Sequence, residues 1–493
     1  MNTACLDQLT LWDLGPQQVT VTFQGGRLVS DAGLLAMRKL DKDLGVLSVL
    51  GARLPDPRSQ KTVIHSRETL LTQQVYQILA GYPDCNDAQT LRNDPFFHAL
   101  LDQSAEGDAR PLASGSTLAR FAQAFTRREA ELPIEERPVL HEVASAQNQR
   151  LKVLNAYLPE LFVRTRRERP ACVILDLDAS DDPAHGQQVL SFFHGYYDQN
   201  QYFPLYVFDG TTGFPLAAWL RPGTVHASCG AVDILKGVVD FLRRAWPNLI
   251  IQVRGDGGFA MPELYEFCEA EGLQYAFGYS TNAVLTRRTD AIANDLELYY
   301  HYYGERDPHV QRFEVFEDYQ AADWTRPRRI VAKVEINRQG LNRRFVVTNL
   351  SGPPQSIYKD FYVKRGHVPE HPIGELKNGL FSDRLSFHHF RANAMKHLEH
   401  VMAYALVILH REATAAIPEV AKAEVHTLRT MLWKVGALVK TSVRRIWFHF
   451  SETWPYRDLW QRVHAALAEF VTQIQHHQAG NLTAPGAPSA LPM

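Results

Sequence analysis

Two short apolar runs that each end in an aspartate constrain the fold of this chain more than any other feature. They are ACVILDLD (171–178) and LIIQVRGD (249–256), and their length is typical of buried strands. Burying a carboxylate at the end of a strand costs free energy unless the carboxylate is paired or lies near a cation. If the two strands are neighbours in one sheet, their carboxylates converge at one edge, as a divalent-metal site requires. The pattern therefore predicts an α/β sheet with an acidic edge.

Four aspartates lie at or just after the first of these runs, and alternation along a strand makes them unequal. Asp176 and Asp178 share one face of the strand. Asp178 stands at the strand end, where loops open a site, whereas Asp176 lies deeper and needs a partner. Asp181 and Asp182 precede Pro183, and we interpret them as turn residues.

The elements between residues 170 and 283 follow the order of a mixed sheet. A turn signal, DGTTG, joins two apolar segments into an antiparallel hairpin, and strands then alternate with amphipathic helices. Three antiparallel strands, a helix, and then parallel strands alternating with helices match the ribonuclease-H-like arrangement. The expected strands are 171–178, 202–210, 213–220, 249–256 and 273–280, and the expected helices are 230–246 and 261–272.

The segments on either side of this core are predicted to be mostly helical. Over residues 66–81, Ser66 is a suitable N-cap and Gly81 a suitable stop for a helix. The segment 284–350 is rich in strand patterns and interrupts the core, whereas the chain after 360 returns to helix, including 427–443. The predicted regions are a helical N-terminal region (1–165), the first part of the core (170–283), the insertion (284–355), the second part of the core (356–400), a helical C-terminal region (401–478) and a disordered Pro-rich tail (479–493).

Composition narrows the class of protein. The net charge of −2 over 493 residues does not favour nucleic acid, so a DNA-binding face must keep its positive charge local, as in RTRRER (164–169) and NRR (342–344). Five cysteines without a CxxC pair argue against a zinc cluster and fit a reducing cytoplasm. The longest apolar run (401–409) is too short to cross a bilayer, and the first residues lack a secretory layout. We therefore expect a cytoplasmic protein without membrane segments.

A magnesium site of this kind needs about three carboxylates, so a third acid has to come from another part of the chain. The stretch FYVKRGHVPEHPIGELKNGL (361–380) offers Glu370 and Glu375. On an α-helix, Lys377 lies within about 20° of Glu370, whereas Glu375 points about 140° away from Glu370. Because Pro372 is tolerated only in a first helical turn, we expect Glu370 at a helix start.

At these residues the chain resembles the DDE transposases of bacterial insertion sequences, most closely those of insertion-sequence family 1380. DLDASDDPAHGQQ (176–188) is similar to the first-aspartate motif of that family, and VRGDGGF (253–259) is similar to the second. SDAGLLAMRKLD (30–41), GYPDCNDAQTLRNDP (81–95) and LASGSTLARF (112–121) also look like family phrases. Four residues follow the matching arginine before the glutamate, where the family has three. The residues at the family's motif positions are Asp178, Asp256, Tyr362, Arg365, Glu370 and Lys377.

The resemblance implies an enzyme that cuts DNA at the terminal inverted repeats of a mobile element and joins it to a target. It implies a ribonuclease-H-like core in which Asp178, Asp256 and Glu370 hold two Mg²⁺ ions, which Mn²⁺ replaces, with Asp178 bridging both. Double-stranded DNA would bind in part to the N-terminal region, and a homodimer would form the synaptic complex in the bacterial cytoplasm or nucleoid. Three residues would hold backbone phosphates, which position DNA without reading its sequence, namely Tyr362, Arg365 and Lys377.

Four further residues are weaker candidates. Asp176 would support Asp178 from the same strand face, and Glu375 is the second acid of its stretch. His185 lies near the first aspartates, where a lone histidine is more often structural. Trp324 would be able to stack on a flipped DNA base, although packing within the insertion explains it better.

Three alternative functions remain open from the sequence. The same core would serve a metal-dependent nuclease or resolvase that performs no strand transfer. An inactive relic that only binds DNA would keep the same fold. A small-molecule α/β enzyme is disfavoured, because the chain has no Gly-rich phosphate loop of the P-loop or dinucleotide-binding type.

Overall fold

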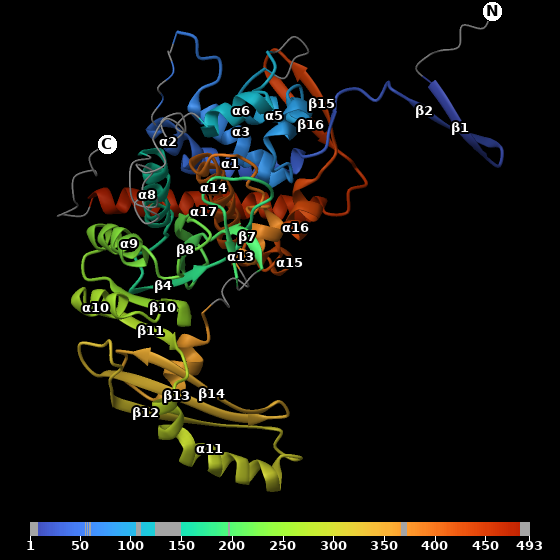
Figure 1. Ribbon diagram of the computed structural model, residues 1–493. Coiled ribbons are helices and arrows are strands. Elements are labelled where there is room, and N and C mark those ends of the chain that lie inside the picture. The colour runs from blue at the N-terminus through green and yellow to red at the C-terminus, as the bar shows by residue number, and fades with distance from the viewer. Residues whose placement is uncertain are drawn as a thin grey trace, which may run out of the picture. The chain divides into compact units, whose positions relative to one another are not determined.

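The computed structural model describes residues 8–54, 56, 58, 61–104, 110–123, 149–195, 198–365 and 372–483, and Figure 1 shows its elements. Two compact units form, each from separate stretches of the chain. The first comprises residues 1–52, 56–121 and 413–471, and the second comprises 53–55, 122–412 and 472–493. Within the described residues, no helix is both long and apolar enough to span a membrane.

The first unit is mainly helical and also contains two small sheets. β1 (Gln8–Leu14) and β2 (Gln17–Thr22) form a two-stranded ribbon, and β3 (Leu28–Val29), β15 (Ala437–Ser442) and β16 (Arg445–Phe450) form a three-stranded sheet in the order β16-β15-β3. The helices are α1 (Leu35–Leu44), α2 (Val46–Arg53), α3 (Arg67–Ala80), α4 (Ala88–Leu91), α5 (Pro95–Leu100), α6 (Gly115–Gln123), α15 (Pro418–Ala421), α16 (Val425–Leu428) and α17 (Arg457–Thr483), whose last residues belong to the second unit.

The helix expected over residues 427–443 is wrong for its second half. Residues 437–442 form β15, which pairs with β16 on one side and with β3 on the other. Strand pairing therefore decides this structure, with β16 directly after it in sequence and with β3 about 400 residues earlier, and local helical spacing does not reveal these partners.

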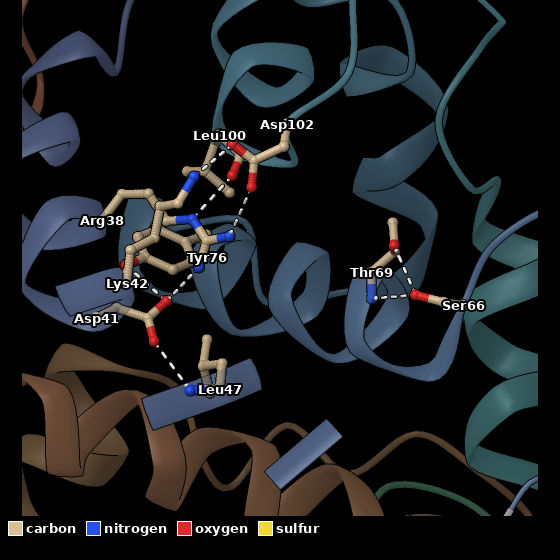
Figure 2. Close-up of polar contacts among 9 residues, drawn as sticks. All are labelled: Arg38, Asp41, Lys42, Leu47, Ser66, Thr69, Tyr76, Leu100 and Asp102. Carbon is tan, nitrogen blue, oxygen red and sulfur yellow. Dashed lines mark hydrogen bonds and ion pairs between the residues drawn. The ribbon is translucent and has the colours of Figure 1, made fainter. Parts of the chain in front are cut away.

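The helix predicted from its end signals is confirmed. Helix α3 begins after Ser66, whose hydroxyl accepts a hydrogen bond from the Thr69 N–H at 3.1 Å (Figure 2). It ends at Gly81, which adopts a left-handed conformation with φ of 90°. Most residues of α3 are buried, so this helix lies at the centre of the first unit.

A buried polar network joins four helices of the first unit (Figure 2). The Arg38 guanidinium of α1 contacts Asp41 at 2.5 Å and donates to the Leu100 carbonyl of α5 at 2.8 Å. Asp41 also accepts from the Leu47 N–H of α2 and from the Tyr76 hydroxyl of α3. Burial raises the pKa of Asp41, and Arg38 opposes that shift. The family-like phrase at 30–41 therefore contains residues that hold the helices together.

The second unit is built on one eight-stranded sheet with the order β12-β13-β14-β11-β10-β4-β8-β9. β4, β10 and β11 are parallel, while β8 and β9 are antiparallel to their neighbours. This mixed sheet is compatible with a ribonuclease-H-like fold. The strands are β4 (Cys172–Ala179), β8 (Leu205–Asp209), β9 (Pro215–Trp219), β10 (Ile250–Gly255), β11 (Gln274–Tyr279), β12 (His309–Tyr319), β13 (Arg328–Asn337) and β14 (Gly340–Thr348). The five strands predicted between 170 and 283 are all present.

Helices and a smaller sheet complete the second unit. The small sheet consists of β5 (Asp182–Pro183), β6 (Phe192–His194) and β7 (Gln199–Tyr202). Both helices predicted in the core are present, and α14 contains the apolar run at 401–409. The helices are α8 (Gln149–Arg164), α9 (Ala231–Ala245), α10 (Pro262–Ala270), α11 (Ala283–Tyr303), α12 (Pro354–Ser356), α13 (Pro372–Gly374) and α14 (Phe390–Ala413).

The segment expected to be a strand-rich insertion has three strands and also a 21-residue helix, α11. Its strands extend the main sheet, because β14 pairs antiparallel with β11. Ala293 and Leu296 of α11 pack on Val334 and Ile336 of β13. Figure 1 shows α11 beside these strands. Of the tail predicted to be disordered, residues 479–483 are the end of α17 and residues 484–493 lie outside the described residues.

Candidate active site

Asp178 lies near the end of β4, where strand alternation places its half-buried side chain on the face opposite Leu175 and Leu177. Its carboxylate accepts a hydrogen bond from the adjacent Ala179 N–H at 2.9 Å. Burial raises the pKa of Asp178 to about 6, Arg365 opposes this shift and the charge of Asp256 adds to it. Among the described residues, no cation forms an ion pair with Asp178.

Asp256 follows β10 directly and begins a short 3₁₀ turn, η4 (Gly257–Phe259). Its carboxylate accepts the Gly258 N–H at 2.9 Å. Because β10 is parallel to β4 and pairs with it, the two strands end at the same sheet edge. The influence of Asp256 on the pKa of Asp178 shows that the two carboxylates come within electrostatic reach.

Of the two glycines after Asp256, Gly258 is needed because a side chain would not fit there, and not because the chain turns sharply. Neither Gly257 nor Gly258 has a positive φ, so the turn does not require their conformational freedom. A Cβ on Gly258 would lie 2.9 Å from the Ala227 Cβ and 3.1 Å from the Asp256 carboxylate. Glycine at 258 therefore leaves room for the aspartate side chain.

Tyr362 and Arg365 lie close to the two aspartates. Tyr362 ends a π-helical turn, η5 (Ile357–Tyr362), and the Arg365 guanidinium lies 6.0 Å from the centre of its ring. Burial raises the pKa of Tyr362, and the charge of Asp256 raises it further, while Arg365 lowers it. The positive charge of Arg365 therefore faces both Asp178 and Tyr362.

Glu370 lies outside the described residues, in the gap between 365 and 372. Pro372 is the first described residue of α13, directly after the stretch that is not described, so its place in a first helical turn stays a prediction. The next turn, η6 (Glu375–Gly379), is π-helical. Because a π-helical turn has more residues than an α-helical one, the α-helical angle that aligned Lys377 with Glu370 does not apply here.

Lys377 has an acidic partner within the chain, and Glu375 has a basic one. Lys377 donates to the Asp181 backbone carbonyl and lies 3.1 Å from the Asp181 carboxylate. Glu375 is buried and forms two contacts of 2.5 Å with Arg411 of α14. This ion pair satisfies Glu375 without a metal, and Lys377 ties the loop after β4 to η6.

Asp176 forms a buried ion pair across the sheet. The Arg254 guanidinium of β10 binds its two carboxylate oxygens at 2.6 and 2.7 Å, and the two residues are direct neighbours in the strand pairing. Arg254 also donates to the Phe361 carbonyl at 2.8 Å, next to Tyr362. Asp176 therefore fixes β4 to β10 and, through Arg254, to η5.

Asp182 is more than a turn residue. It is fully buried, belongs to β5, and has neither carboxylate oxygen hydrogen-bonded among the described residues. The His397 ring of α14 lies 3.7 Å away, and the Lys377 ammonium lies 3.9 Å away. Burial lowers the pKa of His397 to about 3, so this imidazole is neutral near pH 7. Sequence reasoning missed His397, because its partner is 215 positions earlier in the chain.

Two of the weaker candidates lie apart from this site. His185 is exposed in the loop between β5 and β6. Trp324 is 4% exposed and packs edge-on against the rings of Tyr265, Tyr279 and Tyr319. The ring of Trp324 therefore packs against core residues as well as the insertion, and it is not presented to a DNA base in this structure.

A cavity of about 340 Å³ opens beside Asp256 and was not anticipated as part of the site. Its lining includes Gly257, Tyr362 and two arginines of β14, Arg343 and Arg344. Arg343 pairs with Asp290 at 2.9 Å, whereas Arg344 is exposed and lowers the pKa of Tyr362. The basic cluster NRR therefore contributes positive charge next to the aspartates.

Among the residues that the structure describes, no group of three or more histidine, cysteine, aspartate or glutamate side chains is arranged to hold a metal ion. Asp178 and Asp256 bring two carboxylates to one sheet edge. The stretch that would supply a third ligand contains Glu370, which is not described.

One of the comparisons with known proteins shows the family of the chain. A solved structure to which the chain is similar is a piggyBac transposase in a synaptic complex with hairpin DNA, at 10% identity and a TM-score of 0.38, over 95% of this chain and 87% of that chain. No curated protein matches the sequence. A family model described as "Transposase DDE domain group 1" matches residues 13–472, which is most of the chain. The chain therefore belongs to the DDE transposases.

Proposed function

We propose that this transposase binds the terminal inverted repeats of a mobile element and carries out metal-dependent strand cleavage and strand transfer there. Membership of the family supports DNA transposition in general. The observation that carries the finer proposal is the pair Asp178 and Asp256, two carboxylates within electrostatic reach at one sheet edge. Two carboxylates this close repel each other, which costs free energy unless a cation offsets the repulsion.

The residues present fit a divalent cation with oxygen ligands. Asp178 is half-buried, accepts only one hydrogen bond among the described residues, and has its pKa raised to about 6 by desolvation. In the proposal Asp178 and Asp256 provide two ligands and Glu370 the third, for two Mg²⁺ ions or Mn²⁺ in their place. When bound, such ions activate the attacking water or 3′-hydroxyl and stabilise the leaving oxygen.

Positive side chains around this edge would hold the DNA backbone. Arg365 faces Asp178 and Tyr362, and Arg344 lies on the cavity next to Asp256. We assign Arg365 and Tyr362 to the phosphates near the cleaved bond, with Arg344 as an additional contact. Lys377 is held by Asp181, so it orders the loop after β4 and reaches a phosphate only when that ion pair opens.

The proposed assignment to one insertion-sequence family rests on the resemblance seen in the sequence. The motifs around Asp178 and Asp256 support membership of insertion-sequence family 1380, and therefore a bacterial element whose transposase works in the cytoplasm on nucleoid DNA. Cutting two ends of an element requires two active sites, so a homodimer in a synaptic complex belongs to the proposal. The core in this proposal is ribonuclease-H-like, with the 284–355 segment as its insertion.

Cleavage of linear DNA that carries the sequences flanking the gene tests the proposal. Asp256→Asn should abolish Mg²⁺-dependent nicking and joining while DNA binding and folding persist, because it removes a ligand charge and leaves the fold of η4 unchanged. Asp233→Asn, an exposed position on α9, is the matched control and should cleave normally.

The products separate the remaining functions. Nicked DNA without joined products would indicate a nuclease or resolvase. A protein that binds repeat DNA but never cleaves it with Mg²⁺ or Mn²⁺ would be an inactive relic. Normal cleavage by Asp256→Asn would exclude the assigned site.

A further inference from the structure

The hairpin formed by β15 and β16 in the first unit has one packed face and one open face (Figure 1). Cross-strand partners in an antiparallel pair share a face. On the packed face Ala437 and Val439 are buried, and the Phe450 ring packs edge-on against the rings of Trp454 and Trp460. Because Trp460 belongs to α17, these contacts hold the hairpin on the helical part of its unit.

The open face of the hairpin combines positive charge with an aromatic ring. Lys440 and Arg445 are exposed, and the Trp447 side chain is 39% exposed. The turn that joins the strands adds two exposed side chains, Val443 and Arg444. The cross-strand pairs of the open face, from the base of the hairpin to its tip, are Leu438 with His449, Lys440 with Trp447, and Ser442 with Arg445.

No acidic side chain balances this charge locally. Residues 425–451 contain no aspartate or glutamate, although the whole chain has a net charge of −2. Two basic residues of this stretch are held inside the unit, since Arg429 donates to the Leu79 carbonyl at 3.0 Å and Lys434 pairs with Asp31 at 2.8 Å. Three others are exposed and have no ion-pair partner among the described residues, namely Lys440, Arg444 and Arg445.

These three cations select an anionic partner. Basic side chains gathered on one face are the footprint of a nucleic-acid-binding surface. Anionic membrane surfaces select larger clusters, of about four to eight lysines and arginines. The chain belongs to the DDE transposases, whose reactions take place on DNA. Duplex DNA is therefore the partner that charge and family both favour.

We propose that the open face of the β15–β16 hairpin binds the phosphate backbone of duplex DNA. Lys440, Arg444 and Arg445 each contact a phosphate, and the exposed indole of Trp447 adds an apolar contact beside them. Such contacts position DNA without reading its sequence. The inference rests on the proposed function, because its ligand is the DNA of that proposal. It adds a contact outside residues 1–165, in the unit that does not contain Asp178.

The salt dependence of DNA binding tests this contact. Fluorescence anisotropy measures the binding of the full chain to a labelled random-sequence duplex, without divalent metal, over a series of salt concentrations. Each phosphate contact contributes about 0.9 to the slope of log affinity against log salt. Lys440→Gln/Arg444→Gln/Arg445→Gln should therefore lower the slope by about 2.7. It should also raise the dissociation constant at least tenfold at about 0.1 M salt.

A matched control removes the same charge from another part of the surface. Lys152→Gln/Lys236→Gln/Arg244→Gln changes three exposed basic residues of α8 and α9, and it should keep the natural slope and affinity. Because all six positions are exposed, both variants should unfold at the same temperature as the natural chain. An equal loss of binding in both variants would mean a general effect of net charge and would overturn the inference.

The outcomes separate this inference from the proposed function. A hairpin variant that keeps the natural slope while the natural chain still cleaves repeat DNA would overturn the inference alone. A natural chain that binds DNA through the hairpin but never cleaves it would remove the proposed cleavage and leave the inference standing. A hairpin variant that loses binding to phosphatidylserine vesicles but keeps its DNA affinity would assign the face to a membrane instead.

DNA cutting from the tip of the hairpin tests its position directly. Val443 is fully exposed in the turn, so Val443→Cys can carry an iron chelate that cuts nearby DNA. This variant should cut bound duplex DNA more strongly than the natural chain treated with the same reagent. Ile250→Cys, 52% exposed at the start of β10, is the control and should cut no more than the natural chain. Bound DNA that is not cut from position 443 would overturn the inference.

Discussion

Asp176→Asn separates a structural aspartate from Asp178, the aspartate proposed to be catalytic. The substitution removes the negative charge to which Arg254 donates from Nε at 2.6 Å and from Nη2 at 2.7 Å. Arg254 is 2% exposed and a guanidinium remains protonated, so its charge stays buried without a counter-ion. Breaking a buried ion pair by removing one partner costs about 3–5 kcal/mol. We expect a loss of that size in the free energy of unfolding.

A double-mutant cycle, measured by urea unfolding, tests this reasoning. Burial raises the pKa of Asp176, which shows that the carboxylate by itself is unfavourable there and is retained for its partner. Replacing both partners by apolar residues, as in Asp176→Leu/Arg254→Met, should therefore cost much less than the sum of the single substitutions. If the double variant loses as much as that sum, or if Asp176→Asn is as stable as the natural chain, the ion pair does not support β4 and β10.

Asp178→Asn, two residues further along the same face, should behave in the opposite way. The carboxylate is half-buried, it has no ion pair among the described residues, and its pKa is raised to about 6. In metal-free buffer the amide should leave stability unchanged or raise it by roughly 1–2 kcal/mol. Cleavage should be lost. A loss of stability equal to that of Asp176→Asn would mean that Asp178 is also structural.

Two further predictions concern the surroundings of the site. A Cβ on Gly278 would lie 2.5 Å from the Tyr362 hydroxyl and 3.0 Å from the Gly257 nitrogen, so Gly278→Ala should reduce cleavage at least tenfold and cost about 1–3 kcal/mol. The control Gly237→Ala, where a Cβ meets nothing within 4 Å in α9, should keep full activity. Burial keeps His397 neutral in the folded chain down to about pH 3, whereas an unfolded histidine takes up a proton near pH 6.5. Between these two pH values the unfolded chain therefore binds one more proton than the folded chain. As the pH falls over this range, the free energy of unfolding of His397→Leu should therefore decrease less steeply than that of the natural chain, by up to about 1.4 kcal/mol per pH unit. Urea unfolding at several pH values measures both slopes, and equal slopes would refute the buried neutral state.

Local patterns were sufficient for most elements of the core. The strands at 171–178 and 249–256 have lengths and flanking residues that few other structures accommodate, and Ser66 and Gly81 mark the two ends of α3. Local patterns failed at 437–442, because pairing with β3 and β16 overrides local preference there. They also missed α11 in the segment expected to be rich in strands.

The sequence by itself determined which residues are candidates, because motif spacing and strand alternation are properties of the local chain. It placed Asp176, Asp178 and Asp182 in one short stretch and could not rank them by partner. Only the tertiary structure decided that Asp176 pairs with Arg254 and that Asp182 lies buried beside His397. It also left Asp178 with Asp256 and no ion pair among the described residues. The physical reason is that the cost of a buried carboxylate depends on the charges brought next to it, and those charges come from strands and helices distant in the sequence.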